Sequence, residues 1–376
     1  MALKVAIVHD YLNQMGGAEK VVEVFCSMFP DSPVYTSVYD PAAMSPFWRT
    51  RDVRTSFIQR ISPRLGIARA LLPLYPVAFE SFDFQGYDVV LSSTTTFAKG
   101  IVTRPETCHV CYCNNPSRYA WMYHEYVARD RLGSTARRVL PYVVSPLRVW
   151  DYAAAQRVDQ FVAGSFNSAR RIHKFYRRDS VVVQSPIDVN AYTPSPTQDD
   201  YFLIVSRLQS YKRIDLAIEA FNRLRWPLRI IGSGPDAARL RGLAGPTVQL
   251  MGRQPDEVVR EHYSRCQAFI FPGEEDFGLT PLEAQASGRP VLAYGAGGAL
   301  ETVRPGQTGA FFAEQSVDAL VAALRGFDPA RFDPRAARAN AQRFDVSVFK
   351  DRLDAVIDTA YTRHHAALDG VGQPLA

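Results

Sequence analysis

The chain has 376 residues, of which 47% are hydrophobic and 22% charged, the balance of a soluble globular protein. This length exceeds what one small hydrophobic core needs, so two domains are expected. Apolar runs are too short to span a bilayer and no secretory leader is expected, which argues against membrane-spanning and secreted classes. Five cysteines, an odd number, fit a reducing cytoplasm better than a disulfide framework.

The net charge of +5 lies wholly in the first half, where residues 1–190 carry 22 Lys and Arg against 16 Asp and Glu. The excess is densest from Arg49 to Arg69, where six arginines are interleaved with apolar side chains and the only acid is Asp52. A basic amphipathic segment can dock on an anionic membrane surface. A solvated, arginine-rich surface explains the pattern equally well, and both alternatives stay open. No nucleic-acid-binding motif accompanies the charge, so no nucleic-acid partner is expected.

The first predicted strand spans residues 3–9, and a loop containing Gly16 and Gly17 separates it from a predicted helix over residues 18–29. This layout places backbone N–H groups where they can bind a phosphate. Further short strands are predicted at 34–37, 88–92, 108–113, 156–165 and 181–186, in alternation with helical segments. The alternation predicts an α/β fold with a doubly wound parallel sheet.

Three cysteines, Cys108, Cys111 and Cys113, share one predicted strand with His109. Neighbouring side chains on a strand point to opposite faces, so Cys108 and His109 should diverge. No second ligand pair follows at the spacing of a zinc site. We therefore expect buried, reduced thiols and no metal. A polar loop follows the strand and carries Asn114 and Arg118, and the arginine fits a loop salt bridge as well as a substrate contact.

The second half of the chain repeats the strand–loop–helix pattern after a polar, proline-containing segment, residues 190–200, which is the best candidate for a linker. A predicted strand at 201–206 leads into a loop with Arg207 and Lys212. Two fixed cations five residues apart at such a turn can neutralise a diphosphate. The expected domains are residues 1–190 and 198–346.

A dinucleotide fingerprint, G-x-G-x-x-A, spans Gly232 to Ala237. It leaves an oxidoreductase function as a minor alternative. The acidic residue that should end the next strand is lacking, because Glu257 falls in a predicted helix.

The segment from Phe271 to Thr302 carries the strongest functional pattern. Glu275 and Glu283 are eight positions apart, just over two turns of helix. Glycine turns at Gly278 and at 297–298 point N–H groups outward, which suits phosphate. Ionised carboxylates accept hydrogen bonds from sugar hydroxyls. The segment therefore predicts a pocket for a phosphorylated polyol.

The string Glu275-Asp-Phe-Gly-Leu-Thr-Pro-Leu-Glu283 resembles the E-x7-E signature of retaining, nucleotide-sugar-dependent glycosyltransferases of family 4. About thirty residues agree in order and spacing, and the Gly16-Gly17 loop matches the family's Gly-Gly loop. The loop after the cysteine strand resembles the Tyr-Cys-His-Thr-Pro-x-Arg-Tyr loop of bacterial polysaccharide mannosyltransferases. Asn114 stands where those relatives carry His, and it cannot become cationic.

The resemblance implies the GT-B fold, with two Rossmann-like domains facing across a cleft and a last helix, residues 347–365, packing back on the first domain. It implies catalytic roles for Glu275, Arg207 and Lys212, and leaves Asn114 and Arg118 as candidates on the acceptor side. The further residues expected at the donor are Gly16, Gly17, Gly252, Arg253, Phe277, Gly278, Leu279, Thr280 and Glu283.

The resemblance implies transfer of a sugar to a lipid-linked or oligosaccharide acceptor in polysaccharide synthesis. The first choice of sugar is mannose, with GDP-mannose as the donor. A UDP-sugar donor and a non-catalytic sugar-nucleotide-binding subunit remain alternatives. No Asp-x-Asp occurs in the sequence, so no metal and no cofactor are expected. The expected location is the cytoplasm, with peripheral contact with the membrane as a further possibility.

Overall fold

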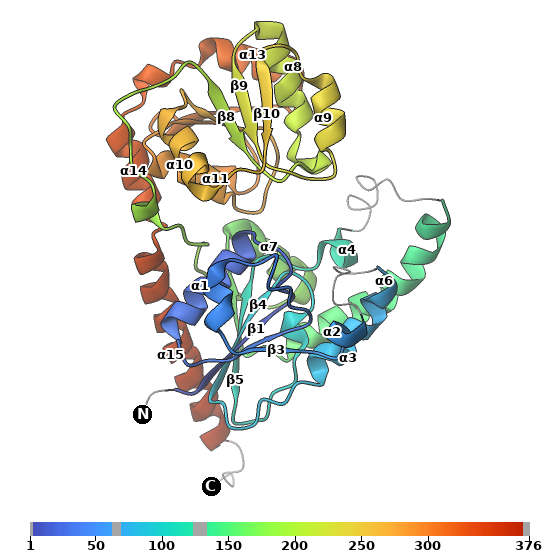
Figure 1. The fold of residues 1–376 in the computed structure, drawn as a ribbon. Coiled ribbons are helices and arrows are strands. Elements are labelled where there is room, and N and C mark those ends of the chain that lie inside the picture. The colour runs from blue at the N-terminus through green and yellow to red at the C-terminus, as the bar shows by residue number, and fades with distance from the viewer. Residues whose placement is uncertain (1–2, 62–68, 123–133, 371–376) are drawn as a thin grey trace. The chain divides into compact units, whose positions relative to one another are not determined.

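The chain folds into two compact units in the computed structural model, which describes residues 3–61, 69–122 and 134–370 (Figure 1). Unit 1 comprises Met1–Gln184 and Phe349–Ala376, and unit 2 comprises Ser185–Val348. The boundary precedes the expected linker because Ile187 is already part of unit 2. Its backbone N–H donates to Phe344 O at 2.9 Å, and its side chain packs with Leu282 and Phe344 in one buried cluster.

Unit 1 is built on a seven-stranded sheet in the order β3-β2-β1-β4-β5-β6-β7, with every pair of neighbours parallel. Its strands are β1 (Val5–His9), β2 (Val34–Thr36), β3 (Val53–Thr55), β4 (Val89–Thr94), β5 (Cys108–Cys113), β6 (Gln160–Ala163) and β7 (Ser180–Val182). The order reverses between β1 and β4, so the loops that follow these two strands flank the switch point of the sheet.

Helices cover both faces of this sheet. Successive residues of a strand point to opposite sides, so an apolar strand has side chains to bury on each face. Val5 and Ile7 of β1 pack with one buried cluster, whereas Ala6 and Val8 pack with another. The helical segments are α1 (Gly17–Met28), η1 (Pro46–Thr50), α2 (Ile58–Ile61), η2 (Arg69–Leu74), α3 (Tyr75–Glu80), η3 (Ala98–Gly100), α4 (Arg118–Trp121), α6 (Ser134–Gln156), α7 (Phe166–Tyr176) and α15 (Val346–Gly370).

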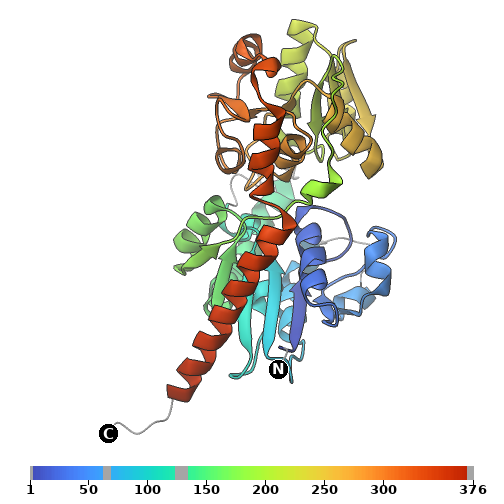
Figure 2. The same ribbon diagram turned by 90° about the vertical axis from the view of Figure 1, so that its left-hand side faces the viewer.

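The last helix, α15, runs along unit 1 for most of its length (Figure 2). Phe349, Leu353 and Ile357 recur at helical spacing and are buried in the cluster that also contains Ile7 and Phe25. This apolar stripe, together with α1, covers one face of the sheet.

Unit 2 has a six-stranded sheet in the order β10-β9-β8-β11-β12-β13, again parallel throughout. Its strands are β8 (Phe202–Val205), β9 (Leu228–Ile231), β10 (Val248–Gly252), β11 (Phe269–Phe271), β12 (Val291–Tyr294) and β13 (Gly309–Phe312). Its helical segments are η4 (Val189–Ala191), η5 (Ser210–Lys212), α8 (Ile214–Leu224), α9 (Ala237–Leu243), α10 (Asp256–Arg265), α11 (Leu279–Ala286), α12 (Ala299–Thr302), α13 (Val317–Gly326), η6 (Pro329–Arg331) and α14 (Pro334–Gln342). The strand order reverses between β8 and β11.

Two doubly wound parallel sheets confirm the predicted α/β class. All five cysteines are free and buried, as predicted for the thiols of the cysteine strand, and Cys108 packs on the opposite face of β5 from Cys111 and Cys113. Among the described residues, no helix combines the length and apolarity needed to cross a membrane.

Candidate active site

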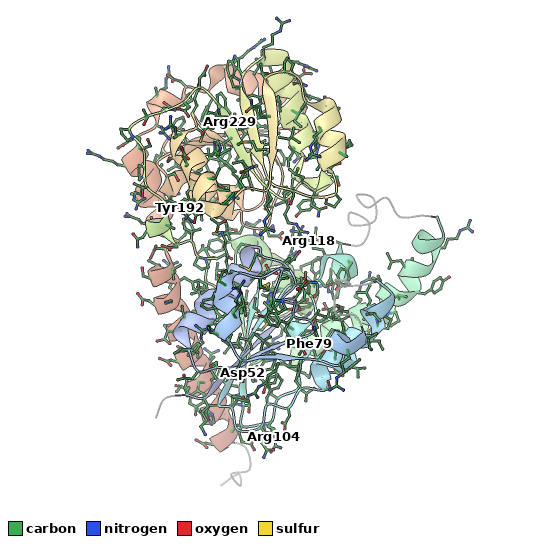
Figure 3. All side chains as sticks on the ribbon, viewed as in Figure 1. Asp52, Phe79, Arg104, Arg118, Tyr192 and Arg229 are labelled. Carbon is green, nitrogen blue, oxygen red and sulfur yellow. The ribbon has the colours of Figure 1, made fainter. Side chains whose placement is uncertain are left out.

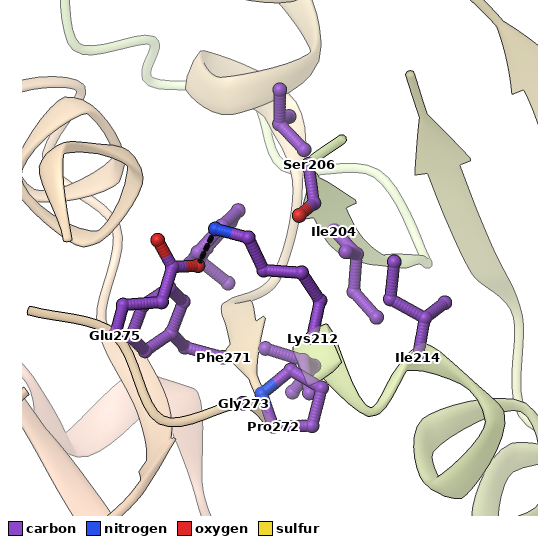
Figure 4. Close-up of a pocket in the computed structure, with 11 residues that line it drawn as sticks. Ile204, Ser206, Lys212, Ile214, Phe271, Pro272, Gly273 and Glu275 are labelled. Carbon is purple, nitrogen blue, oxygen red and sulfur yellow. Dashed lines mark ion pairs between the residues drawn. The ribbon is translucent and has the colours of Figure 1, made fainter. Parts of the chain in front are cut away.

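The switch point of unit 2 gathers the charged loops that the sequence singled out. In open parallel sheets, ligands bind beyond the carboxyl ends of the strands where the order reverses. β8 is followed by the loop that carries Arg207 and Lys212, and β11 is followed by the loop that carries Glu275. A small pocket lies between these loops (Figure 4).

Lys212 and Glu275 meet in this pocket through an ion pair between Nζ and Oε1. Their side chains are only 14% and 20% exposed, so water screens the pair less than it would on an open surface. Ser206, Ile214, Phe271 and the backbone of Gly273 are among the other lining residues. The pocket therefore presents one cation and one carboxylate side by side, the pair of groups needed for a phosphate and a sugar hydroxyl.

Arg207 lies on the same loop as Lys212 and is exposed. Its carbonyl oxygen accepts hydrogen bonds from the Ser206 hydroxyl at 3.2 Å and from Gln209 N at 2.9 Å, which hold the backbone of the loop. The loop ends at Arg213, whose left-handed φ of 52° turns the chain into α8. Two cations thus follow the central strand β8, as the sequence predicts.

Glu283 occupies a different environment from Glu275. It lies within α11, is 8% exposed, and its Oε2 accepts a hydrogen bond of 2.8 Å from the Tyr263 hydroxyl of α10. Burial and then the charge of Glu283 raise the pKa of both Tyr263 and Tyr192, so both phenols stay protonated and can donate (Tyr192 is labelled in Figure 3). The second glutamate of the signature is thus held by tyrosines, while the first lies in the pocket.

The start of α11 is formed by the other residues that the resemblance assigns to the donor. Gly278 is the N-cap of α11 and has a φ of 89°, which favours glycine. Leu279 and Thr280 are half-buried in the first turn. Phe277 is 7% exposed and packs edge-on against Phe344, with ring centroids 5.7 Å apart, so its side chain belongs to the core of unit 2.

The expectation of a free amide at Gly298 is wrong. Its N–H donates to Glu275 O at 2.8 Å, which ties the loop after β12 to the loop after β11. A Cβ at Gly298 would lie 2.1 Å from Phe277 O, so only glycine allows the two backbones to approach this closely. The glycine positions the glutamate loop and does not offer its N–H to a phosphate.

The glycine fingerprint after β9 has a packing role as well. A Cβ at Gly232 would lie 1.9 Å from Ser206 O, so this glycine lets the β9 loop pack against the β8 loop. Its N–H donates to the carbonyl of Gly252, the last residue of β10, at 2.8 Å, and the neighbouring Arg253 is exposed. Glu257 lies in α10, as predicted, so the acidic residue of a dinucleotide site is missing from the strand end.

In unit 1, Gly16 is the N-cap of α1 and Gly17 is its exposed first residue. The buried side chain of Glu19 lies beside them, because a Cβ at Gly16 would be 2.9 Å from Glu19 Oε2. Glu19 Oε1 is 3.8 Å from Nε2 of buried His9. Burial lowers the pKa of His9, but the carboxylates of Glu19 and Asp10 outweigh it and raise the pKa above its usual value.

Asp10, which the sequence patterns did not single out, lies at the switch point of unit 1. Its carboxylate accepts backbone hydrogen bonds of 2.6–2.9 Å from four successive residues after β4, Thr95, Thr96, Phe97 and Ala98. The Thr95 hydroxyl adds a fifth bond of 2.8 Å. The signal that could have revealed Asp10 is its position, one residue past the first buried strand.

The acceptor-side candidates lie beyond the carboxyl end of β5. The Asn114 side-chain amide donates to Ser93 Oγ at 3.1 Å, and the backbone carbonyl oxygen of Asn114 accepts from Ser168 Oγ at 2.6 Å. Arg118 is the first residue of α4 and is half-buried (labelled in Figure 3). The neutral side-chain amide of Asn114 thus holds the loop to the end of β4, a contact for which a charged side chain is not needed.

The basic segment between Arg49 and Arg69 is partly engaged with the protein. Arg51 donates to Pro30 O at 3.0 Å, and Arg54 forms an ion pair of 2.8 Å with Asp52. Arg49 and Arg60 are exposed, whereas Arg64 and the side chain of Arg69 lie outside what the structure describes.

Comparison with known proteins bears on both units. Residues 190–341 match the family described as glycosyl transferases group 1. A D-inositol 3-phosphate glycosyltransferase of Mycolicibacterium paratuberculosis is 28% identical over 366 residues, covering 84% of this chain and 81% of that protein. A protein of the same description from Mycobacterium avium is 28% identical over 262 residues, but that alignment spans only 61% of its length.

Solved structures share the fold. Sucrose-phosphate synthase of Thermosynechococcus elongatus superimposes with a TM-score of 0.74 at 17% identity, over 96% of this chain and 100% of that chain. HepE of Anabaena in complex with UDP-glucose gives a TM-score of 0.69 at 17% identity, over 95% and 100% of the two chains. The chain therefore has the GT-B fold, and its residues 190–341 are similar to the group 1 glycosyltransferases.

Proposed function

We propose that the chain is a retaining glycosyltransferase of family 4 that transfers a sugar from a nucleoside diphosphate donor bound at the carboxyl end of β8 and β11. The observation that carries the proposal is the contact between Lys212 and Glu275 in the pocket at that point. A bound diphosphate adds negative charge beside Lys212 and displaces Glu275 from it. The released carboxylate is then available to the hydroxyls of the donor sugar.

The same cations support the chemical step. When the glycosidic bond breaks, negative charge develops on the departing diphosphate. Lys212, and Arg207 on the same loop, stabilise that charge more in the transition state than in the ground state. Because fixed side-chain cations supply this charge, we propose that the diphosphate needs no divalent metal. The acceptor attacks on the face that the diphosphate leaves, and the departing phosphate takes its proton.

Glu283 is proposed to hold the ribose of the donor. Its carboxylate is already fixed by the Tyr263 hydroxyl at 2.8 Å, so little conformational entropy remains to be lost on binding. Gly252 and Arg253 at the end of β10 are proposed to lie near the base, and the half-buried first turn of α11 near the phosphates.

Two nucleotide sugars are candidates for the donor. GDP-mannose is supported by the Tyr112, Cys113, Pro116, Arg118 and Tyr119 pattern, which resembles the mannosyltransferase loop. A UDP-sugar is supported by the similarity of fold to HepE, a protein solved with UDP-glucose. The proposed acceptor is a lipid-linked oligosaccharide in polysaccharide synthesis, which would bring the enzyme to the inner face of the cell membrane.

The experiment is a donor panel. The purified chain is incubated with GDP-mannose, UDP-glucose and UDP-galactose, each with a membrane extract or a synthetic polyprenol-diphosphate sugar as the acceptor. Release of nucleoside diphosphate and formation of a glycosylated lipid are measured together. Turnover of one donor supports the proposal and selects the base. Tight binding of a donor without any turnover would instead favour a sugar-nucleotide-binding subunit.

A further inference from the structure

A second cluster of functional side chains lies in unit 1, at the opposite end of its sheet from Asp10 and Asn114. Cys108 is the first residue of β5, Asp159 immediately precedes β6, and His364 lies in α15. One potential ligand atom from each of these residues lies within 4.8 Å of the other two. The three residues are distant in sequence, so no spacing motif predicts that they lie together.

Neighbouring groups orient two of these side chains. His364 Nε2 lies 2.7 Å from Pro105 O, so this nitrogen carries the hydrogen and donates it to the carbonyl. Its Nδ1 then lies 3.4 Å from Asp159 Oδ1. The other carboxylate oxygen of Asp159 accepts a hydrogen bond of 2.7 Å from His109 N. A histidine held by a carbonyl and a carboxylate held by a backbone amide are the outer contacts that commonly orient metal ligands.

The spacing suits a tetrahedral cation. Bonds of about 2.0 Å from nitrogen and oxygen place two ligands of one zinc ion about 3.3 Å apart. The observed 3.4 Å between His364 Nδ1 and Asp159 Oδ1 matches that separation without movement. The thiol of Cys108 lies within 4.8 Å of a ligand atom of each of the other two residues and supplies the third ligand. One thiolate, one imidazole and one carboxylate form a ligand set that selects zinc over magnesium or calcium.

We propose that Cys108, Asp159 and His364 bind one divalent cation of the zinc class, which ties the end of α15 to the amino ends of β5 and β6. Asp159 and His364 also line a pocket with Thr107, Arg104 and Arg157, through which the ion can enter (Arg104 is labelled in Figure 3). The cation acts on the stability of unit 1 and has no part in sugar transfer.

Two features of the site set its affinity. Burial and then the charge of Asp159 raise the pKa of the Cys108 thiol to about 12, so a metal ion must displace the proton of this thiol when it binds. Arg157 and Arg104 add positive charge nearby, although Arg157 is paired with Glu80 at 2.9 Å. Thiolate and carboxylate together neutralise the charge of the ion, and Glu80 offsets the charge of Arg157.

The chain offers a matched control in a second histidine–aspartate pair. His173 Nδ1 lies 3.6 Å from Asp179 Oδ1, but this pair is on the surface and does not belong to the three-residue cluster. If a histidine–aspartate pair alone attracted a metal ion, both pairs would do so. Cys26, which is buried and free, serves as the matched control for a thiol.

The test is a titration of the full-length chain, stripped of metal, with Co²⁺, whose bond to a thiolate gives a charge-transfer band in the near ultraviolet. We expect one equivalent to bind with this band in the parent, in His173→Gln and in Cys26→Ser. The band should disappear in Cys108→Ser. In His364→Gln, whose side chain is nearer the surface and whose fold should survive, the dissociation constant should rise at least about tenfold. Zn²⁺ should displace Co²⁺ and raise the midpoint of thermal unfolding with its concentration.

A titration that gives no charge-transfer band in the parent would overturn the proposal. So would an equal dissociation constant for Co²⁺ in the parent and in His364→Gln, because the histidine would then not be a ligand. Sugar transfer should be equally fast before and after metal removal at a temperature where the chain stays folded, which separates this site from the proposed activity.

Discussion

Replacing Glu275 by glutamine and replacing Glu283 by glutamine should have different effects on the affinity for the nucleotide. Glu275 pairs with Lys212 in the pocket, whereas Glu283 accepts a hydrogen bond from Tyr263. In Glu275→Gln, Lys212 loses its carboxylate partner and its charge becomes fully available to a diphosphate. The affinity for free nucleoside diphosphate should therefore stay constant or rise. The value of kcat should fall, because the hydroxyls of the transferred sugar lose the charged carboxylate that accepts their hydrogen bonds.

Glu283→Gln should instead weaken the binding of free nucleoside diphosphate and of the donor together. The amide oxygen of glutamine can still accept from the Tyr263 hydroxyl, so the fold of this region should be retained. A hydrogen bond to a charged group contributes about 1.5–3 kcal/mol, and each 1.36 kcal/mol is a factor of ten. The dissociation constant should thus rise roughly ten- to a hundredfold if the ribose hydroxyls bind Glu283.

Isothermal titration calorimetry with GDP and UDP on both variants, combined with steady-state rates, separates these outcomes. Glu274→Gln is the matched control, since this neighbouring glutamate is exposed and should change neither quantity. Equal losses of nucleotide affinity in Glu275→Gln and Glu283→Gln would refute the assignment of roles. An unchanged kcat in Glu275→Gln would refute the proposed contact with the sugar.

Three further predictions concern the metal, the loops and the membrane. Excess chelator should leave sugar transfer intact, and loss of activity that Mg²⁺ or Mn²⁺ restores would show that the diphosphate needs a metal. Gly298→Ala should lower the free energy of unfolding of unit 2 by about 1–3 kcal/mol or more, because its Cβ would meet Phe277 O at 2.1 Å. A urea titration measures this loss, and in it Gly242→Ala, within α9 and with open space around it, should be neutral or stabilising by up to about 1 kcal/mol. Vesicle sedimentation should show binding to anionic lipid that falls with salt and in the double variant Arg49→Glu, Arg60→Glu; equal binding to neutral vesicles would argue against docking through this segment.

Much of the fold could be predicted because buried parallel strands are short, continuous apolar runs. β5 matches its predicted bounds of 108–113, and α1 begins one residue before the predicted helix at 18–29. The segment at 156–165 was harder, because α6 continues to Gln156 and only Gln160–Ala163 is a strand. Alanines at 153–155 suit a helix as well as a buried strand, so an apolar pattern alone could not place this boundary.

The site could be predicted only where its residues are close in sequence. The signature located Glu275 and Glu283, and the turn after a strand located Lys212. The pattern could not tell that Lys212 would meet Glu275, because this contact depends on the order of strands in the sheet. It also could not tell that Gly298 would donate to Glu275 O, since a glycine turn looks the same whether its amide is free or bonded.

The sequence patterns could not predict which charged side chains of unit 1 are buried. Lys99 and Asp151 form a buried ion pair, and Asp151 also accepts hydrogen bonds from Trp121 Nε1 at 2.6 Å and the Tyr176 hydroxyl at 2.9 Å. A lysine and an aspartate 52 positions apart resemble ordinary surface residues until the fold brings them together. The same holds for Asp10, whose carboxylate accepts five hydrogen bonds from four residues more than eighty positions away.

Transfer of sugar by the parent chain and by Lys212→Ala, side by side, tests the central claim most directly. If the donor diphosphate binds beyond β8 and β11, the parent turns over one nucleotide sugar and kcat/KM of Lys212→Ala falls roughly ten- to a hundredfold. Arg241→Ala, which removes an exposed cation from α9, should keep the parental rate. Equal rates in the parent and in Lys212→Ala, or no transfer by the parent from any donor that it binds, would contradict the account.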